Sequence, residues 1–150
     1  MIEQITDFDD LPEKQITPLA EEFFAEAKIP GEFNYQHLRR NLSMTMSMGL
    51  SAMWVTKREG KIVGAICGML YPDVFTGDLI AVENFWFVTK DCRGTDGLRL
   101  LGEFEAWAKE NGAKRIVVAH MANIHPESMS AFYERRGFKA LETNYVMEVE

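Results

Sequence analysis

The sequence has few residues that could cross-link a small fold through disulfides or a metal ion. Its two cysteines, Cys67 and Cys92, lie far apart, so they provide neither a disulfide framework nor the spacing of a metal site. We therefore expect no metal and a reducing compartment, the cytoplasm. Signal peptides and apolar runs of membrane-spanning length are also missing, and no membrane partner is expected.

Positive charge is scarce as well. Lysine and arginine number 16 against 23 aspartates and glutamates, for a net charge of −7. This balance disfavours general nucleic-acid binding, which needs a basic surface, but it is compatible with a cationic amine as partner. Internal repeats and linkers are absent, and the 150 residues fit a single domain over 1–150.

The strongest pattern lies between residues 79 and 110. Leu79–Val88 is apolar, aromatic and β-branched, which predicts a buried strand. Apolar residues then recur at helical spacing, which predicts a helix: Leu98, Leu101, Phe104, Trp107 and Ala108. This helix should end at Asn111-Gly112.

The turn between this strand and helix reads Arg93-Gly94-Thr95-Asp96-Gly97. Thr95 or Asp96 can cap the helix. Free N–H groups at a helix start, with Arg93 and Arg99 beside them, form a site for a phosphate anion. Neither a P-loop nor a dinucleotide fingerprint fits, because no lysine follows Gly97 and only two of the glycines are present. A capped turn without a ligand is the alternative interpretation of this loop alone.

This stretch resembles the pyrophosphate loop of the GNAT family of acetyl-CoA-dependent N-acetyltransferases. That loop joins a strand ending in Val to Arg-Gly-x-Gly-x-Gly and a helix that starts with Leu-Leu. With one loop residue deleted, the matching residues are Val88, Arg93, Gly94, Gly97, Leu100 and Leu101. Asp96 falls at or beside a usual glycine, where its charge would repel a pyrophosphate. The resemblance implies acetyl-CoA as co-substrate, with Val88 contacting the pantetheine arm. It also implies a set of residues around the pyrophosphate: Arg93, Gly94, Thr95, Asp96, Gly97 and Leu98.

The other predicted elements complete a fold. Their order is an edge strand at 1–6, a helix that starts at Asp9-Asp10 and ends at Pro30-Gly31, a helix at 34–46, strands at 52–57 and 61–71, the 79–88 strand and its helix, a strand at 115–119, a helix from Pro126 to Gly137, and a last strand at 143–149. This order predicts an α+β protein with a central mixed, mostly antiparallel sheet flanked by helices, and it is also the order of the GNAT fold. The methionines at 44, 46, 48 and 53 are expected in the core, with an acceptor-pocket wall as the alternative.

A second motif supports the same resemblance. Ala131 to Phe138 reads Ala-Phe-Tyr-Glu-Arg-Arg-Gly-Phe, which is similar to the last helix of GNAT enzymes. By its motif position, Tyr133 matches the tyrosine that protonates the CoA thiolate, with a core aromatic as the alternative. The family often has an asparagine seven residues earlier. Pro126 stands there, and Asn123 is a nearby candidate for CoA contact.

Acetylation of an amine needs a base, because an amine with a pKa of about 10.4 is almost fully protonated at neutral pH. Glu83 is the candidate, since an acid inside an apolar strand should have a raised pKa, and several GNAT members use a glutamate on this strand. An ion-paired or edge glutamate is the alternative. His120 or His125 could also serve as the base, although solvated loop histidines are commoner.

Together these observations predict transfer of an acetyl group from acetyl-CoA to a small-molecule or peptide amine by direct attack in a ternary complex. A GNAT-fold module without catalysis, or a domain for another phosphorylated ligand, are the alternatives. Whether the chain is a monomer or a homodimer stays open.

Overall fold

The computed structural model describes residues 1–150, and its frame is one five-stranded sheet in the order β1-β2-β3-β4-β5. The strands are β1 (Ile2–Gln4), β2 (Ser51–Arg58), β3 (Lys61–Pro72), β4 (Leu79–Val88) and β5 (Arg115–Val117). All neighbours are antiparallel except β4 and β5, which run parallel. The predicted α+β architecture with a mixed, mostly antiparallel sheet is therefore confirmed.

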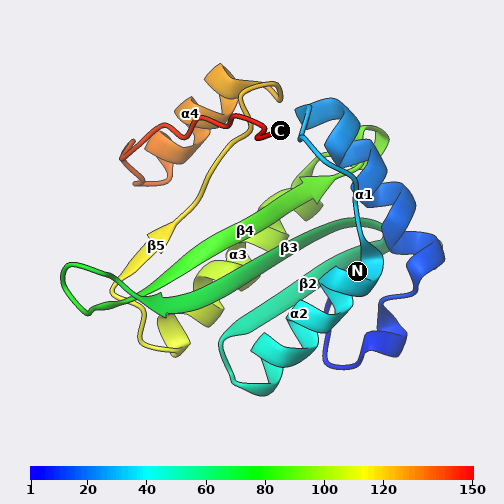
Figure 1. Cartoon of the computed structure of the whole chain (residues 1–150), viewed down its shortest axis with the longest axis horizontal. Helices are drawn as coiled ribbons and strands as arrows, with labels where there is room; N and C mark the ends of the chain where they lie inside the picture. Colours follow the sequence, from blue (N-terminus) through cyan, green and yellow to red (C-terminus); the bar gives the residue numbers. More distant parts are fainter.

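Helices cover both faces of this sheet. They are α1 (Glu13–Ala27), α2 (Tyr35–Ser47), α3 (Thr95–Glu110) and α4 (Pro126–Arg135), with short 3-10 turns at Phe8–Asp10 and Lys90–Cys92. Figure 1 shows α1 and α2 on one face and α3 behind the other, with α4 beyond the end of β5. No helix combines the length and the apolar character that crossing a lipid bilayer requires.

Two apolar cores follow from this layering. Leu100, Leu101 and Phe104 of α3 pack on one sheet face, while Ile16 of α1 and Leu42 of α2 pack on the other. Each side chain buried in this way stabilises the fold by about 1.5–3 kcal/mol.

A glycine sets how closely α3 can approach the sheet. A Cβ on Gly68 of β3 would lie 2.3 Å from the Phe104 ring, far inside van der Waals contact. Gly68 therefore lets the Phe104 ring of α3 lie directly on β3, and any larger residue at this position would push the helix away.

The first helix begins later than the acidic pair suggests. Asp9 and Asp10 lie in a 3-10 turn that Asp7 caps, and α1 starts at Glu13 after Pro12. It also ends before Pro30, because Lys28 takes a left-handed conformation (φ 54°) after Ala27. Local capping thus shortens this helix at both ends.

The expectation that four methionines fill the core is wrong for two of them. Met53 is buried in the core beside α1 and α2, and Met46 packs against it. Met44 and Met48 instead remain 59% and 63% exposed, because they lie on the outer side of the last turn of α2.

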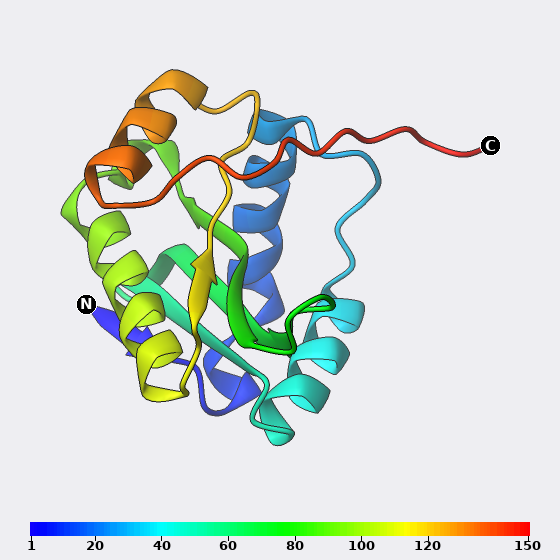
Figure 2. The same cartoon turned by 90° about the vertical axis from the view of Figure 1, so that its left-hand side faces the viewer.

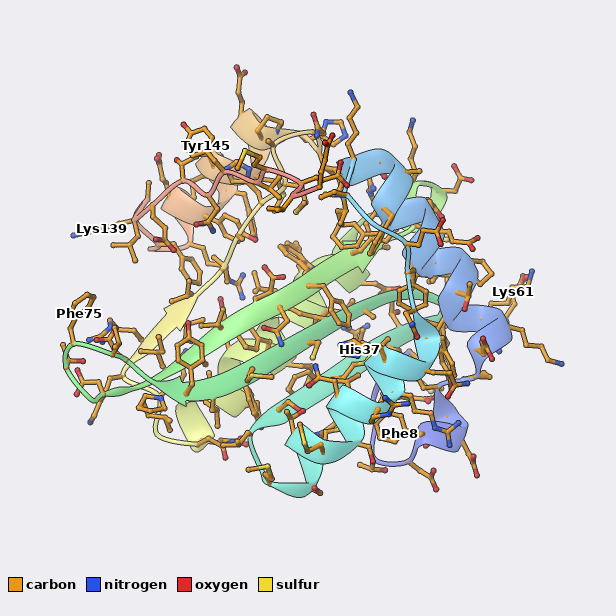
Figure 3. All side chains as sticks on the ribbon, viewed as in Figure 1. Phe8, His37, Lys61, Phe75, Lys139 and Tyr145 are labelled. Carbon is orange, nitrogen blue, oxygen red and sulfur yellow. The ribbon has the colours of Figure 1, made fainter.

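The last predicted strand does not form in this structure. Residues 138–150 have no regular secondary structure, and Figure 2 shows the chain leaving the body after α4. Tyr145 and Val149 are 93% and 88% exposed, and the Tyr145 side chain is labelled on this segment in Figure 3. The segment pairs with no strand in this structure, although the outer edge of β5 is open.

Candidate active site

Strands β4 and β5, at one edge of the sheet, separate partway along β4. They pair only where Ile80–Val82 lies beside Arg115–Val117, and Figure 1 shows them diverging from there. A β-bulge marks the same point on the other edge of β4, since Cys67 pairs with Phe85 while Gly68 pairs with Glu83. Asn84 is the extra residue. Bulges re-aim side chains, and this one sets Glu83 at the point of separation.

Glu83 lies half-buried at this point. Its Oε2 atom accepts a hydrogen bond from the backbone N–H of Ala119 at 3.1 Å. Burial raises the pKa of Glu83 to about 7, and the hydrogen bond from Ala119 opposes part of that rise. The raised pKa expected for an acid inside this apolar strand is confirmed. A carboxyl that titrates near neutral pH is suited to accept protons at that pH.

Tyr133 of α4 reaches the same backbone residue from the other side. Its hydroxyl donates to the carbonyl oxygen of Ala119 at 2.8 Å, so Ala119 joins Glu83 and Tyr133. Burial, and next the charge of Glu83, raise the pKa of the Tyr133 hydroxyl above its ordinary value, so it stays protonated at neutral pH.

The end of α4 fixes this tyrosine in place. The N–H of Phe138 donates to the Tyr133 carbonyl at 2.9 Å, and Gly137 takes φ 100° between them. The two rings meet edge-on with centroids 5.6 Å apart. This is a Schellman-type helix end, and it holds the tyrosine ring against the core.

The start of α3 is uncapped. Gly94 precedes it and no side chain hydrogen-bonds its first turn, so the cap expected from Thr95 or Asp96 is wrong. Asp96 instead accepts a hydrogen bond from Thr56 Oγ1 at 3.1 Å and lies 3.6 Å from Arg58 Nε. These partners on β2 compete for its carboxylate, so the first N–H groups of α3 stay open for another acceptor.

Arg93 is already engaged by the protein. Its Nε donates to the Val88 carbonyl at 3.0 Å, its Nη2 pairs with Glu26 of α1, and its guanidinium lies 5.4 Å from the centroid of the Phe87 ring. The hydrogen bond from Arg93 also lowers the pKa of Glu26. Arg93 therefore ties the end of β4 to α1, with less of its charge left for a ligand.

The remaining predicted site residues are spread around this loop. Gly97 is buried, whereas Thr95, Leu98 and Arg99 are exposed on the first turns of α3. Asn123 donates from Nδ2 to the carbonyl of Ala27 at 3.1 Å and so bonds α1 rather than the α3 loop.

The two loop histidines are also placed. His120 and His125 are both exposed, and His125 sits at φ 42° just before α4. Neither shares the Ala119 hydrogen bonds of Glu83 and Tyr133.

Sequence reasoning missed two features of this region. The Trp86 indole N–H is buried without a hydrogen-bond partner, close to where a Cβ on Gly97 would lie. A cavity of about 250 Å³ also lies between α1, α2 and β4 and includes Phe23, Asn84 and Phe85. Two sequence features pointed to the cavity: the polar Asn84 inside an apolar strand, and Met53, for which a pocket wall was the alternative to the core.

A family model matches most of the chain. The model of the acetyltransferase (GNAT) family matches residues 14–138. No curated protein sequence matches the chain significantly.

Solved structures match over almost the whole chain. Glucosamine-6-phosphate N-acetyltransferase from Arabidopsis thaliana is similar with a TM-score of 0.75 and 15% identity, covering 100% of this chain and 99% of that one. A transcriptional regulator from Bacillus halodurans has a TM-score of 0.74 and 22% identity, with 99% of each chain covered. A ribosomal-protein-alanine N-acetyltransferase from Brucella melitensis biovar Abortus has a TM-score of 0.67 and 18% identity, covering 100% of this chain and 99% of that one. Identities this low show a shared fold.

Proposed function

Because the chain belongs to the GNAT acetyltransferase family, we propose that it transfers an acetyl group from acetyl-CoA to an amine by direct attack in a ternary complex. The observation that carries this proposal is the pair of hydrogen bonds that bring Glu83 and Tyr133 to Ala119, where β4 and β5 separate. A base and an acid thus face the only part of β4 whose outer edge has no strand partner.

The residues around α3 fit a CoA pyrophosphate. The uncapped first turn of α3 offers N–H groups and the positive end of the helix dipole to an anion. Gly94, Thr95, Gly97 and Leu98 would contribute those N–H groups, and the exposed Arg99 would add charge. Asp96 and Arg93 would act mainly through the protein contacts that shape the loop.

The open edge of β4 would hold the pantetheine arm. From Glu83 to Val88 the strand has no partner on its β5 side, so backbone groups there are open to a ligand. In the family, the residue that matches Val88 offers its backbone to the pantetheine arm. The Arg93 contact to the Val88 carbonyl occupies one lone pair of that oxygen. Asn123, which bonds α1, would support the wall of this opening rather than contact CoA.

Acetyl-CoA supplies an acetyl thioester when bound. Glu83 takes a proton from the bound ammonium, directly or through one water, and the neutral amine then attacks the thioester carbonyl. As the N–C bond forms, the nitrogen loses a second proton to solvent and becomes an amide nitrogen. Tyr133 donates its hydroxyl proton to the sulfur as the C–S bond breaks. The products are an amide and free CoA, and Glu83 and Tyr133 exchange their protons with solvent before the next cycle.

Acetyl-CoA should raise the melting temperature of the protein. A ligand bound only by the native state stabilises it by about 2.7 kcal/mol at one hundred times its dissociation constant, and the uncapped α3 start is the expected site. Differential scanning fluorimetry with acetyl-CoA, and with acetate as the control, measures the shift. No shift at millimolar acetyl-CoA would contradict the proposal as a whole.

We further propose that the chain forms a homodimer through its C-terminal segment. Residues 143–149 carry the predicted strand pattern, and the segment exposes Leu141, Tyr145, Val146, Met147 and Val149. The outer edge of β5 has no partner strand. An apolar segment and an unpaired edge on one chain are complementary between two copies.

A variant that ends at Ala140 should therefore be a monomer, whereas the full chain should have twice the mass of its own monomer by light scattering. Tyr145→Ser and Val149→Ser together should weaken the dimer in the same direction. A monomeric full chain at concentrations above the micromolar range would contradict this assembly.

A further inference from the structure

The cavity between α1, α2 and the sheet is almost entirely apolar. Its volume is about 250 Å³, and phenylalanine rings form much of its wall: Phe23, Phe24, Phe33, Phe85 and Phe87. Asn84 is the only polar residue that lines it. Asn84 is also exposed, whereas every other lining residue is buried or half-buried, so the polar end of the cavity faces the surface.

The size and shape of the walls favour an aromatic guest. A cavity of roughly 150 Å³ lined by apolar side chains holds one benzene, so this one has room for a ring and a short alkyl arm. Phe23 already stacks on Phe87 with centroids 4.9 Å apart, and Phe24 meets Phe33 edge-on at 6.2 Å. A further ring would extend this packing in the stacked or edge-on geometry that aromatic pairs prefer.

The polar end of the cavity lies one residue from Glu83 along β4. Asn84 follows Glu83 at the bulge of β4. Both side chains also shift the pKa of Cys67, which is buried in the same apolar core as Met53 and Ala65 of the cavity wall. Burial chiefly raises the pKa of the Cys67 thiol, with a contribution from the charge of Glu83, and a hydrogen bond with Asn84 opposes the rise. An amine on a short arm would therefore leave the cavity next to Glu83.

We propose that this cavity binds the acceptor, and that the acceptor is a small primary amine with one aromatic ring on a short alkyl arm. The inference rests on the acetyl transfer proposed above and names its substrate class. Asn84 would orient the amine at the mouth, and the five phenylalanines would bind the ring. The bonds made and broken are those of the transfer described above.

The same walls select against other amines. Amino sugars and polyamines carry several hydroxyl or ammonium groups, and burying such groups without hydrogen-bond partners is unfavourable. A single asparagine cannot satisfy them. An apolar surrounding also disfavours a charged ammonium, so an amine held here loses its proton to Glu83 more readily than it does in water.

The test compares three amines, of which phenethylamine and ethanolamine share an aminoethyl arm. Release of CoA from acetyl-CoA by the full chain is measured with phenethylamine, with ethanolamine and with spermidine. Burying a ring is expected to raise kcat/KM for phenethylamine roughly 10- to 100-fold above that for ethanolamine. Equal or higher kcat/KM for ethanolamine or spermidine would overturn the aromatic class while acetyl transfer itself stands. No transfer to any amine would instead contradict the proposed function, and the inference with it.

A binding measurement and a matched pair of variants complete the test. Calorimetric titration of phenethylamine into the protein with CoA should show binding whose heat capacity change is negative, as burial of apolar surface requires. Ala20→Phe, which fills the cavity, should raise KM for phenethylamine about 10-fold or more and leave the affinity for acetyl-CoA unchanged. Ala25→Phe places the same residue on the exposed side of α1 and should change neither. Unaltered KM in folded Ala20→Phe would overturn the assignment of the cavity.

Discussion

Glu83→Gln should lower kcat/KM by about 10²–10⁴-fold at neutral pH, the range expected when a general base is lost. The amide keeps the size of the side chain and can still accept the hydrogen bond from Ala119, but it cannot take a proton. In the wild type, kcat/KM should rise with pH through an apparent pKa near 7, the pKa to which burial raises Glu83. In the variant, kcat/KM should rise with pH only because the amine itself loses its proton. CoA release, followed from about pH 6 to about pH 9, measures both profiles.

The same substitution should change stability in a defined pH window. Burial raises the pKa of Glu83 from 4.5 to about 7, so the folded state binds this proton more tightly than the unfolded state does. Glu83 therefore lowers the stability progressively as pH rises from about 4.5 to about 7. Glu83→Gln should melt above the wild type at alkaline pH, with a smaller difference at acidic pH. Glu103→Gln, on an exposed residue of α3, is the control for charge alone. If kcat/KM of Glu83→Gln had the wild-type dependence on pH, Glu83 would not be the base.

Tyr133→Phe should lower kcat with little change in acetyl-CoA affinity. The ring keeps its contacts with Trp86, Phe132 and Phe138, and only the hydroxyl that donates to Ala119 is lost. Because a thiol with a pKa of about 8.5 is a fairly good leaving group, we expect a loss near the low end of the range for general acids, about 10²-fold. The loss should shrink as pH rises toward that pKa, where the thiolate can leave without a proton.

Stability separates this role from a packing role. Losing the hydrogen bond to Ala119 should cost about 1 kcal/mol, a change that lowers the melting temperature at all pH values alike. Tyr71→Phe, at a tyrosine of β3 that is 43% exposed, should change neither kcat nor stability. Wild-type kcat in Tyr133→Phe at pH near 6 would show that Tyr133 serves only the core.

Local patterns predicted the centre of this fold well. The apolar β4 and the helical repeat of α3 each depend on neighbours within their own segment, and both form where the sequence indicates. The raised pKa of Glu83 was also predictable, because an acid within an apolar strand is desolvated wherever that strand is buried.

Contacts between distant segments were not predictable in this way. Asp96 would cap α3 if only its own loop mattered, but Thr56, 40 residues away, binds its carboxylate. Arg93 looked like a pyrophosphate ligand, and its pairing with Glu26, 67 residues away, depends on how α1 crosses the sheet. The bulge at Asn84 likewise depends on the register between β3 and β4.

The C-terminal segment shows a third limit. The alternating pattern from Thr143 to Val149 indicates that a strand could form, but it does not indicate which strand edge would pair with it. The outer edge of β5 is open in the same copy, but the segment does not pair with it and stays irregular and exposed. A pattern of this kind is complete only when the partner is known.

Transfer of a labelled acetyl group tests the central claim most directly. The full chain is incubated with acetyl-CoA that carries a carbon isotope in the acetyl group and with a mixture of amines and peptides, and the products are identified by mass spectrometry. The account predicts a labelled amide with the wild type, and far less of it with Glu83→Gln under the same conditions. Label that stays in acetyl-CoA, or that appears only as free acetate, while acetyl-CoA is bound would contradict it.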